Sequence, residues 1–497
     1  MRLLHSMVLQ GIYGLPIFIE IDTQPGIPSF TIVGLGDASI QESRERIRSA
    51  VKNSEYSFPV RRVTINLAPA HIRKTGSHFD LAIAIGLILQ DAIKTETSLR
   101  LQETLILGEL ALDGKLRPLI GTLPLIISAR KQGFTQVMIP SENMEEVWQI
   151  DGIKIIAVGS LSEGLAYFLS GIIPIPTPQK ISNQKTQIKV PLESIIGQNR
   201  VKRGLIIAAS GGHNLLLEGP PGSGKSMLCS ALQGILPKLN QEESLEVAQI
   251  YSVVGLALPH GNKNRPFRHI HHTASAVSIV GGGKYCRPGE MSLAHHGVLF
   301  MDEILEFDRP VIESLREPME SREIHISRAF GTYTYPASFM LVGAMNPCPC
   351  GYLGDTEHIC KDTANEILKY RSKLSGPILD RIDIFLTVPR VPLAEIQQRG
   401  TEKMLTTTQA KQQVEAAVQI AMQRQNKLNT NLLPQELEKM EIESEAYVLL
   451  QQAMERLSLS LRAYHRILRV SRTIADLEGT KKIAPAHVAE AIGYRQN

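Results

Sequence analysis

The stretch with the clearest chemical signature is a glycine-rich loop between an apolar run, residues 215–218, and a helical segment, residues 227–236. It consists of Gly219, Pro220, Pro221, Gly222, Ser223, Gly224, Lys225 and Ser226. Glycines let backbone N–H groups turn towards phosphate oxygens, and the following helix adds its positive N-terminal end. In this pattern the lysine reaches the β and γ phosphates and the serine hydroxyl binds Mg²⁺. The loop predicts a nucleoside triphosphate site, and a chance glycine-rich turn is the alternative.

Two further apolar runs end in polar side chains that suit hydrolysis. Residues 297–301 lead into Asp302 and Glu303, and residues 339–345 lead into Asn346. Together with the glycine-rich loop, Asp302 is expected to orient Mg²⁺ through water and Glu303 to polarise the attacking water. Asn346 would position that water or touch the γ phosphate. Alone, the first run would be a buried strand whose end emerges into solvent.

Several arginines indicate that the site is not formed by one chain alone. Arg381 lies well past the third apolar run and predicts an arginine finger that neutralises charge in a neighbouring subunit, which implies a ring. Arg462, Arg466 and Arg469 are spaced to share one face of a helix. For Arg466 and Arg469 a solvated basic stripe is an equal alternative.

The elements that must position these residues fall into three domains. Residues 173–190 are rich in proline and polar residues and contain no acid, which is typical of a linker. Before it, residues 1–172 alternate strand and helix patterns and predict an α+β domain. Residues 191–395 alternate strands and helices as a P-loop α/β core, and residues 396–497 show helical spacing throughout.

Composition excludes several other classes of protein. Hydrophobic residues make up 43% and charged residues 21% of the 497, so a wholly disordered or fibrous chain is excluded. The longest apolar stretch, residues 81–89, is shorter than the ~20 residues of a membrane span. No secretory signal is recognisable, and five cysteines do not predict a disulfide framework, so we expect a cytoplasmic protein without a membrane anchor. The net charge of +4 leaves only local basic surfaces.

The motifs together carry a family resemblance. The glycine-rich loop, the Asp302-Glu303 strand end and the segments 345–351, 375–383 and 462–476 resemble the magnesium-chelatase-like AAA+ family of YifB and ComM. The resemblance implies an N-terminal domain similar to Lon protease and ribosomal protein S5, an AAA+ core with a pre-sensor 1 hairpin, and a helical lid. It also implies a hexameric ring that promotes DNA branch migration in recombination or natural transformation. By position, Asn346 matches sensor 1, Arg381 the finger and Arg462 sensor 2.

The similarity to Lon does not extend to catalysis. Residues 108–118 and 137–140 resemble the Lon stretch that carries the catalytic lysine, but residues 121–125 hold none. Ser77 lies near the nucleophile region without a base to activate it. The N-terminal domain is therefore expected to be a protease-inactive binding or assembly module.

A basic stretch in the core predicts contact with DNA. No carboxylate occurs between Glu246 and Glu290. The stretch carries Lys263, Arg265, Arg268, Lys284 and Arg287, and the segment 323–335, which resembles the pre-sensor hairpin, adds Arg328. Lysine and arginine on a loop facing a ring pore would bind phosphates without sequence preference. A solvated loop is the alternative.

Cysteines form one candidate metal site. Cys348, Cys350 and Cys360 could bind zinc as thiolates, with His358 or Asp362 as the fourth ligand. The family often has a second Cys-x-Cys pair where this chain has Asp362, and reduced thiols without metal are an equal alternative. The histidines at 269–272 and 295–296 lack ligand spacing and are expected to have ordinary polar roles.

Three functions remain open. The first is an ATP- and Mg²⁺-dependent ring motor acting on DNA, a helicase. The second is a chelatase-like chaperone that drives metal insertion through a protein partner. The third is a nucleotide-dependent protein scaffold.

Overall fold

The structure is a computed structural model that describes residues 2–34, 36, 38–91, 95–147, 150–173, 190–256, 258, 261–328, 331–355, 357–392, 405–457 and 459–495. The predicted linker, residues 173–190, lies outside this set except for its two end residues. The predicted boundary between core and lid, at residue 396, also lies outside it.

The N-terminal domain is built on a seven-stranded mixed sheet of order β3-β4-β2-β1-β5-β8-β9. Its strands are β1 (Arg2–Gln10), β2 (Tyr13–Gln24), β3 (Ser29–Val33), β4 (Arg62–Ala68), β5 (Thr104–Ile106), β8 (Gln136–Pro140) and β9 (Lys154–Val158), and β6 (Glu109–Leu110) pairs with β7 (Leu116–Arg117) apart from it. Within the seven-stranded sheet, strands β1 and β4 pair antiparallel with β2, and the other pairs are parallel. Strands β6 and β7 pair antiparallel.

Helices cover this sheet. They are α1 (Ala38–Asn53), α2 (Asp80–Ile88), α3 (Thr95–Glu103), α4 (Thr122–Lys131), α5 (Met144–Val147) and α6 (Leu161–Ser170), with short 3₁₀ turns at Leu89–Asp91 and Ser141–Asn143. The apolar run at 81–89 forms most of α2, which is buried nearly all round between the sheet and α6. A helix that is apolar on every side must lie in a core. The mixture of strands and helices predicted for residues 1–172 is present in this domain.

The core domain contains a five-stranded parallel sheet of order β11-β14-β17-β10-β18. Its strands are β10 (Leu215–Glu218), β11 (Phe267–Ile270), β14 (Val298–Met301), β17 (Met340–Met345) and β18 (Ile384–Thr387). Strands β14 and β17 are buried throughout, as expected for a parallel sheet with helices on both faces. The covering helices include α7 (Asn199–Gly211), α8 (Lys225–Ile235) and α9 (Gln241–Val253).

Smaller elements are inserted between the core strands. The antiparallel hairpin of β15 (Glu323–Arg328) and β16 (Gly331–Pro336) lies beside the ribbon of β12 (Gly281–Gly282) and β13 (Arg287–Pro288). The buried Tyr335 joins the two, because its hydroxyl donates to the carbonyl of Cys286 over 2.8 Å. The short helices are α10 (Ala276–Val280), α11 (Glu290–Leu293), α12 (Arg309–Ser314), α13 (Pro318–Ser321), α14 (Ala364–Arg371) and α15 (Gly376–Leu379).

The C-terminal domain is helical. It consists of α17 (Thr407–Gln425), α18 (Pro434–Leu437), α19 (Ser444–Arg456), α20 (Leu461–Leu477) and α21 (Pro485–Ile492). Helix α20 packs against α21, α17 and core helix α7, so core and lid share one apolar cluster. Among the described residues, no helix has the length and apolar composition that a membrane span needs.

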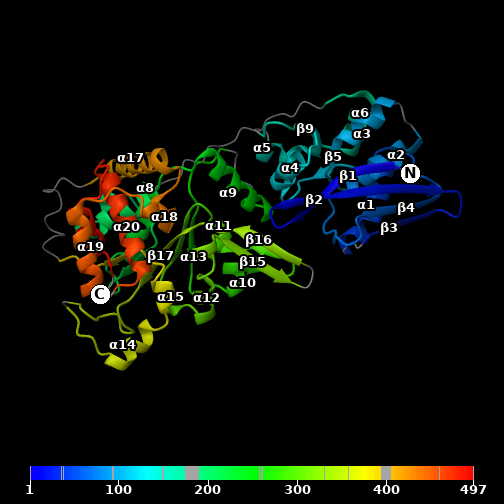
Figure 1. Cartoon of the computed structure of the whole chain (residues 1–497). Coiled ribbons are helices and arrows are strands. Elements are labelled where there is room, and N and C mark those ends of the chain that lie inside the picture. Colours follow the sequence, from blue (N-terminus) through cyan, green and yellow to red (C-terminus); the bar gives the residue numbers. More distant parts are fainter. Residues whose placement is uncertain are drawn as a thin grey trace.

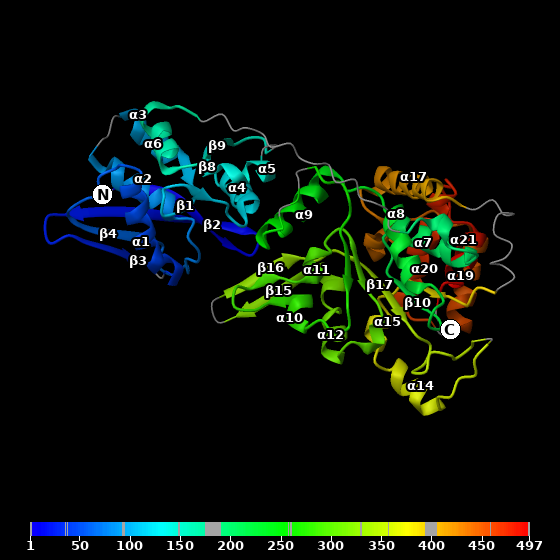
Figure 2. The same ribbon diagram turned by 180° about the vertical axis from the view of Figure 1, so that it is seen from behind.

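The N-terminal domain contacts the core through α9, which lies between the two in Figure 1. Helix α4 packs on α9, and Ala248 joins the apolar cluster of Met7 and Leu123. The N–H of Gly121 also donates to the carbonyl of Ser252 over 3.0 Å. The reverse view shows α14 on the side of the core away from this contact (Figure 2).

Candidate nucleotide-hydrolysis site

The glycine-rich loop connects β10 to α8 at the carboxyl edge of the core sheet. Gly222 and Gly224 have φ values of 76° and 91°, which side chains disfavour. A Cβ on Gly219 would lie 2.3 Å from the carbonyl oxygen of Val388. Glycine at these positions therefore allows the loop conformation that a phosphate-binding loop needs.

Lys225 begins α8 and is buried within the loop. Its Nζ donates to the carbonyls of Gly219 (2.7 Å) and Pro220 (2.9 Å) and to Oδ1 of Asn346 (3.1 Å). Burial lowers the pKa of Lys225, and the carboxylates of Asp302 and Glu303 oppose that shift. In such a desolvated position, a phosphate oxygen would interact strongly with the ammonium group.

Ser226 and Asp302 form an adjacent oxygen pair. The Ser226 hydroxyl donates to Oδ2 of Asp302 over 2.7 Å, and Oδ1 of Asp302 accepts the N–H of Glu303 over 3.1 Å. Hydroxyl and carboxylate oxygens beside a phosphate-binding loop are the ligands that Mg²⁺ uses together with substrate phosphates. These two side chains therefore fit a Mg²⁺ ion.

Glu303 is turned towards solvent next to this pair. It has a φ of 51°, uncommon for a residue with a side chain, and its side chain is 52% exposed. Its Oε2 lies 3.4 Å from Nδ1 of His272, which follows β11. The sequence analysis did not assign His272 to the site, although its position two residues beyond a core strand places it at the same edge.

Arg371 is a second residue at this edge that the sequence analysis missed. From α14 it pairs with Glu218, the last residue of β10, and its Nε donates to the carbonyl of Pro347 over 3.1 Å. Burial raises the pKa of Glu218, and Arg371 opposes the shift. Arg371 thus ties the segment after Asn346 to the strand that leads into the phosphate loop.

Arg381 lies at the opposite edge of the same sheet. It precedes β18, and its carbonyl accepts a hydrogen bond from Nδ2 of Asn214, which precedes β10, over 2.9 Å. The strands are parallel and the phosphate loop follows β10, so the four residues of β10 separate the two edges by about 13 Å. Arg381 is therefore on the far side of the sheet from its own chain's phosphate loop.

A cavity of about 580 Å³ opens beside Arg381. Five arginines line it, namely Arg322, Arg381, Arg462, Arg466 and Arg469, together with Glu320, Asp380 and Asp383. Arg381 pairs with Glu320 and donates to the carbonyl of Pro377 over 2.6 Å. Arg462 is exposed. We call this surface the arginine face.

Arg466 and Arg469 do not form a solvated stripe. Arg466 donates to the carbonyls of Leu379 (3.1 Å) and Ile382 (2.6 Å), and Arg469 donates twice to the carbonyl of Leu432. Arg466 is only 5% exposed. Both residues donate to main-chain carbonyls. The hydrogen bonds of Arg466 join the lid to the core segment around Arg381.

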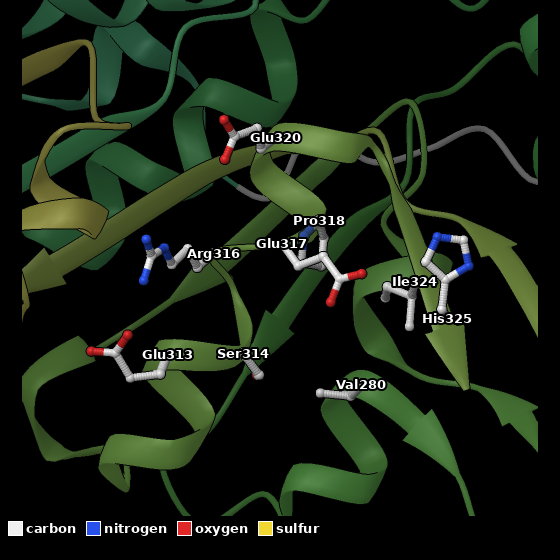
Figure 3. Close-up of a pocket in the computed structure, with 9 residues that line it drawn as sticks. All are labelled: Val280, Glu313, Ser314, Arg316, Glu317, Pro318, Glu320, Ile324 and His325. Atoms are coloured by element: carbon white, nitrogen blue, oxygen red, sulfur yellow. The ribbon is translucent and has the colours of Figure 1, made fainter. Parts of the chain in front are cut away.

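A second cavity, of about 420 Å³, lies between α10, α12, α13 and β15 (Figure 3). Its lining consists of Val280, Glu313, Ser314, Arg316, Glu317, Pro318, Glu320, Ile324 and His325. Three of these are glutamates, which would repel phosphate groups. None of these lining residues belongs to the phosphate loop, so this cavity is separate from the candidate nucleotide site.

The predicted DNA-binding residues divide into two groups. Arg265 pairs with Glu243 over 3.0 Å, and Arg268 forms a two-pronged pair with Glu290 over 2.6 and 2.8 Å. Glu243 lies before and Glu290 at the end of the stretch that contains no carboxylate, and each pairs with an arginine inside it. Both guanidinium groups are therefore bonded within the chain, and contact of Arg265 and Arg268 with DNA stays a prediction.

The other four basic residues, Lys263, Lys284, Arg287 and Arg328, are exposed. Between two of them lies Tyr285, 62% exposed, with Lys284 Nζ 5.5 Å and Arg287 Cζ 5.8 Å from its ring centre. A Cβ on Gly282 would lie 3.3 Å from Nη2 of Arg328, so the two hairpins meet here. We call Lys284, Tyr285, Arg287 and Arg328 the basic tip. Tyr285 carries no charge and was not among the predicted DNA-binding residues.

The histidine candidates have hydrogen-bonding roles. His295 and His296 both bond Oε2 of Glu246, over 3.1 and 2.6 Å. The N–H of Ser338 donates to Nδ1 of His295, so the neutral ring carries its proton on Nε2 and has no lone pair there for a metal. His358 stacks on Tyr352 and lies 3.6 Å from Asp355. Of the two candidates for the fourth zinc ligand, the structure places Asp362, and not His358, beside the three thiols.

The N-terminal domain gives Ser77 a partner other than a lysine. Its hydroxyl bonds Glu109, which lies 3.5 Å from Arg117. Lys74, the nearest lysine in sequence, is buried and donates to the carbonyl of Pro69. A carboxylate held by arginine is a weak base, so this arrangement does not activate the serine.

The fold, a parallel sheet in a mixed α/β chain with C-terminal helices, is consistent with an AAA+-like chelatase fold. Three family models match: magnesium chelatase, subunit ChlI, at residues 191–396; subunit ChlI of Mg-chelatase at 19–143; and magnesium chelatase, subunit ChlI C-terminal, at 404–495. The uncharacterized protein YifB of Escherichia coli K12 is 41% identical over 497 residues, covering 100% of this chain and 97% of the relative. Competence protein ComM of Haemophilus influenzae is 40% identical, with 100% and 97% covered.

Similarity to chelatase subunits themselves is more limited. The magnesium-chelatase 67 kDa subunit of Heliobacterium mobile is 28% identical over 195 residues, which is 33% of this chain and 29% of that subunit. The full-length matches and the three family models agree. The chain belongs to the magnesium-chelatase-like family that includes YifB and ComM.

Proposed function

We propose that this protein is an ATP-hydrolysing AAA+ ring motor that acts on DNA, a ComM-like helicase that promotes branch migration in recombination or natural transformation. The observation that carries the proposal is the separation of two incomplete half-sites on one sheet. Phosphate-loop residues lie at the carboxyl edge and the arginine face lies at the amino edge. Copies arranged head to tail would bring the carboxyl edge of each chain to the amino edge of the next, and such contacts form a ring when the rotation between neighbours closes. We propose a hexamer.

Each residue at the carboxyl edge has a distinct part in hydrolysis. The loop from Gly219 to Gly224 and Lys225 would bind the phosphates of ATP, and Ser226 and Asp302 would hold Mg²⁺, which neutralises phosphate charge. Glu303 accepts a proton from the attacking water, and His272 at 3.4 Å orients its carboxylate. Asn346, already bonded to Lys225, holds the γ-phosphate end of the site.

The amino edge completes the site of the neighbouring subunit. Arg381 would neutralise the charge that develops on the transferred phosphoryl group. Arg462, the exposed arginine of the same face, assists it from the lid. Because lid and core contribute to one face, hydrolysis in one subunit can be coupled to movement of the next.

DNA contact is assigned to the basic tip and to Lys263. Lysine and arginine neutralise backbone phosphates, and the exposed ring of Tyr285 offers a base a surface for stacking. This combination favours DNA over an acidic protein, for which the aromatic ring has no special use. The N-terminal domain is proposed to be a protease-inactive binding or assembly module, and the protein is proposed to act in the cytoplasm.

The test is ATP hydrolysis by the purified protein with and without single-stranded and forked DNA. Lys225→Ala is the blank, and Lys238→Ala, an exposed lysine outside the site, is the matched control. We expect stimulation by DNA that fades as salt rises, and its loss in Lys284→Ala/Arg287→Ala. Hydrolysis that needs Lys225 but is indifferent to DNA would contradict the DNA assignment and favour a chelatase-like chaperone or a scaffold that acts on protein partners.

A further inference from the structure

Three cysteines and an aspartate converge in the segment between β17 and α14. The Sγ atoms of Cys348, Cys350 and Cys360 lie 3.4, 3.6 and 3.6 Å apart in their three pairs. Oδ2 of Asp362 lies 3.7 Å from Sγ of Cys360 and accepts the N–H of Cys350 over 2.8 Å. Four potential ligand atoms thus surround one point.

The spacing of these atoms matches a tetrahedral metal site. With zinc–sulfur bonds of ~2.3 Å, neighbouring thiolates in a tetrahedron lie about 3.8 Å apart, within a few tenths of an ångström of the distances here. A disulfide needs sulfurs at about 2.05 Å and joins only two of three cysteines. The arrangement of three near-equal sulfur distances is therefore explained better by a shared ion.

We propose that Cys348, Cys350, Cys360 and Asp362 bind one zinc ion in a closed, four-ligand structural site. Thiolates select zinc over Mg²⁺ or Ca²⁺, which prefer oxygen ligands. Four protein ligands leave no open position, so the ion holds structure and takes no part in hydrolysis. The proposal does not depend on the DNA function.

The site fixes the segment that carries Asn346 against the phosphate loop. Cys348 follows Asn346 by two residues, and Asn346 bonds Lys225. Gly351, with a φ of 85°, packs on the loop so closely that a Cβ there would lie 2.6 Å from Cδ of Pro221. Residues 346–362 contain no helix or strand among those described, so their shape depends on side-chain links.

The aspartate makes this zinc site distinctive. Its oxygen is a harder donor than sulfur and is better suited to hard cations, so the ion should exchange more readily than from four thiolates. Asp362→Cys would supply a fourth thiolate at the same position. We expect this substitution to retain zinc and to slow its removal by a chelator.

The test measures metal directly, on the full-length protein purified without chelator. We expect about one zinc per chain by elemental analysis and, after replacement by Co²⁺, sulfur-to-metal charge-transfer absorption with a tetrahedral spectrum. Cys350→Ser and Asp362→Ala should lower zinc content at least several-fold. The matched controls His358→Ala and Lys361→Ala, on the same segment, should keep it.

Folding is checked separately, since loss of zinc could follow from loss of structure. Circular dichroism of each variant identifies misfolded ones, and Co²⁺ titration of chelator-treated wild-type protein tests the site without any substitution. Absence of both stoichiometric zinc and the Co²⁺ charge-transfer bands would overturn the proposal. Loss of zinc from folded His358→Ala would overturn the assignment of Asp362.

Discussion

The two edges of the core sheet differ in how their polar residues are used. At the carboxyl edge, Lys225, Asn346, Ser226 and Asp302 are linked by hydrogen bonds of 2.7 to 3.1 Å and can surround one ligand. At the amino edge, arginines bond to carbonyls or to Glu320 and line an open cavity. This difference supports the proposal that one chain carries two complementary halves of an active site and needs a neighbouring subunit to complete each.

The largest effect expected is from Arg381→Ala. Because Arg381 lies on the far side of the sheet from its own phosphate loop, nucleotide binding should change less than about threefold, while hydrolysis falls by about 10³. Binding of a fluorescent ATP analogue and steady-state hydrolysis measure the two. If Arg381→Ala lost both nucleotide binding and hydrolysis, or lost neither, the assignment of different roles to the two edges would be contradicted.

Glu303→Gln tests the carboxyl edge. The amide keeps the shape of the side chain but cannot accept a proton, so hydrolysis should fall by about 10² while ATP binding persists. His272→Gln should cause a smaller loss, because His272 acts through Glu303. A normal rate in Glu303→Gln would show that another base is used. The pH dependence of the residual hydrolysis rate in His272→Gln shows whether His272 orients the Glu303 carboxylate or only supports the local structure.

Substitutions of Arg462 and Arg466 should have different effects, because Arg462 is exposed and Arg466 is buried within the arginine face. Arg462→Ala removes an exposed side chain, so the free energy of unfolding should stay within about 0.5 kcal/mol while hydrolysis drops. Arg466→Met removes the side-chain donor to the carbonyl of the buried Ile382, while the carbonyl of Leu379 keeps the N–H of Ile382, and should cost about 2–3 kcal/mol. Urea unfolding and hydrolysis are measured on both variants. Equal stability of the two would contradict these assignments.

The smallest effect expected is a dependence of stability on pH at the amino edge. Burial lowers the pKa of His295, and protonation would put a hydrogen on Nδ1, where the ring now accepts the N–H of Ser338. As pH falls below the ordinary histidine value of about 6.5, the unfolded chain binds a proton that the folded chain does not, so stability falls.

The expected loss between pH 7.5 and 6 is at most about 1 kcal/mol, measured from urea midpoints. His295→Gln should show a weaker dependence over this range. A stability that rises as pH falls through this window would contradict the role assigned to His295. Glu246, whose pKa the two histidines lower, contributes only at more acid pH.

Sequence predicted the carboxyl edge better than the amino edge, for a physical reason. A phosphate loop and strand-end carboxylates are local patterns, and a parallel sheet necessarily gathers strand ends at one edge. Ion-pair and hydrogen-bond partners that are distant in sequence produce no local pattern of this kind. Arg265 forms an ion pair with Glu243, and Arg268 forms one with Glu290. Arg466 donates to main-chain carbonyls, and Arg381 pairs with Glu320.

The metal candidates show the same limit. Spacing alone left His358 and Asp362 as alternatives for the fourth position beside the cysteines. In the structure Asp362 lies beside the thiols while His358 stacks on Tyr352, an arrangement that no periodicity indicates. Likewise, the placement of the Tyr285 ring between Lys284 and Arg287 has no counterpart in charge patterning.

The central claim, that each active site is shared by two subunits, is tested most directly by mixing two inactive variants. Arg381→Ala keeps an intact carboxyl edge and Glu303→Gln keeps an intact arginine face. Equal amounts of the two, assembled together, should recover about a quarter of the wild-type ATP hydrolysis rate, because that share of interfaces pairs two intact halves. A mixture of Arg381→Ala with Lys225→Ala/Arg381→Ala should recover none. A rate no higher than the sum of the two separate variants in the first mixture would contradict the account.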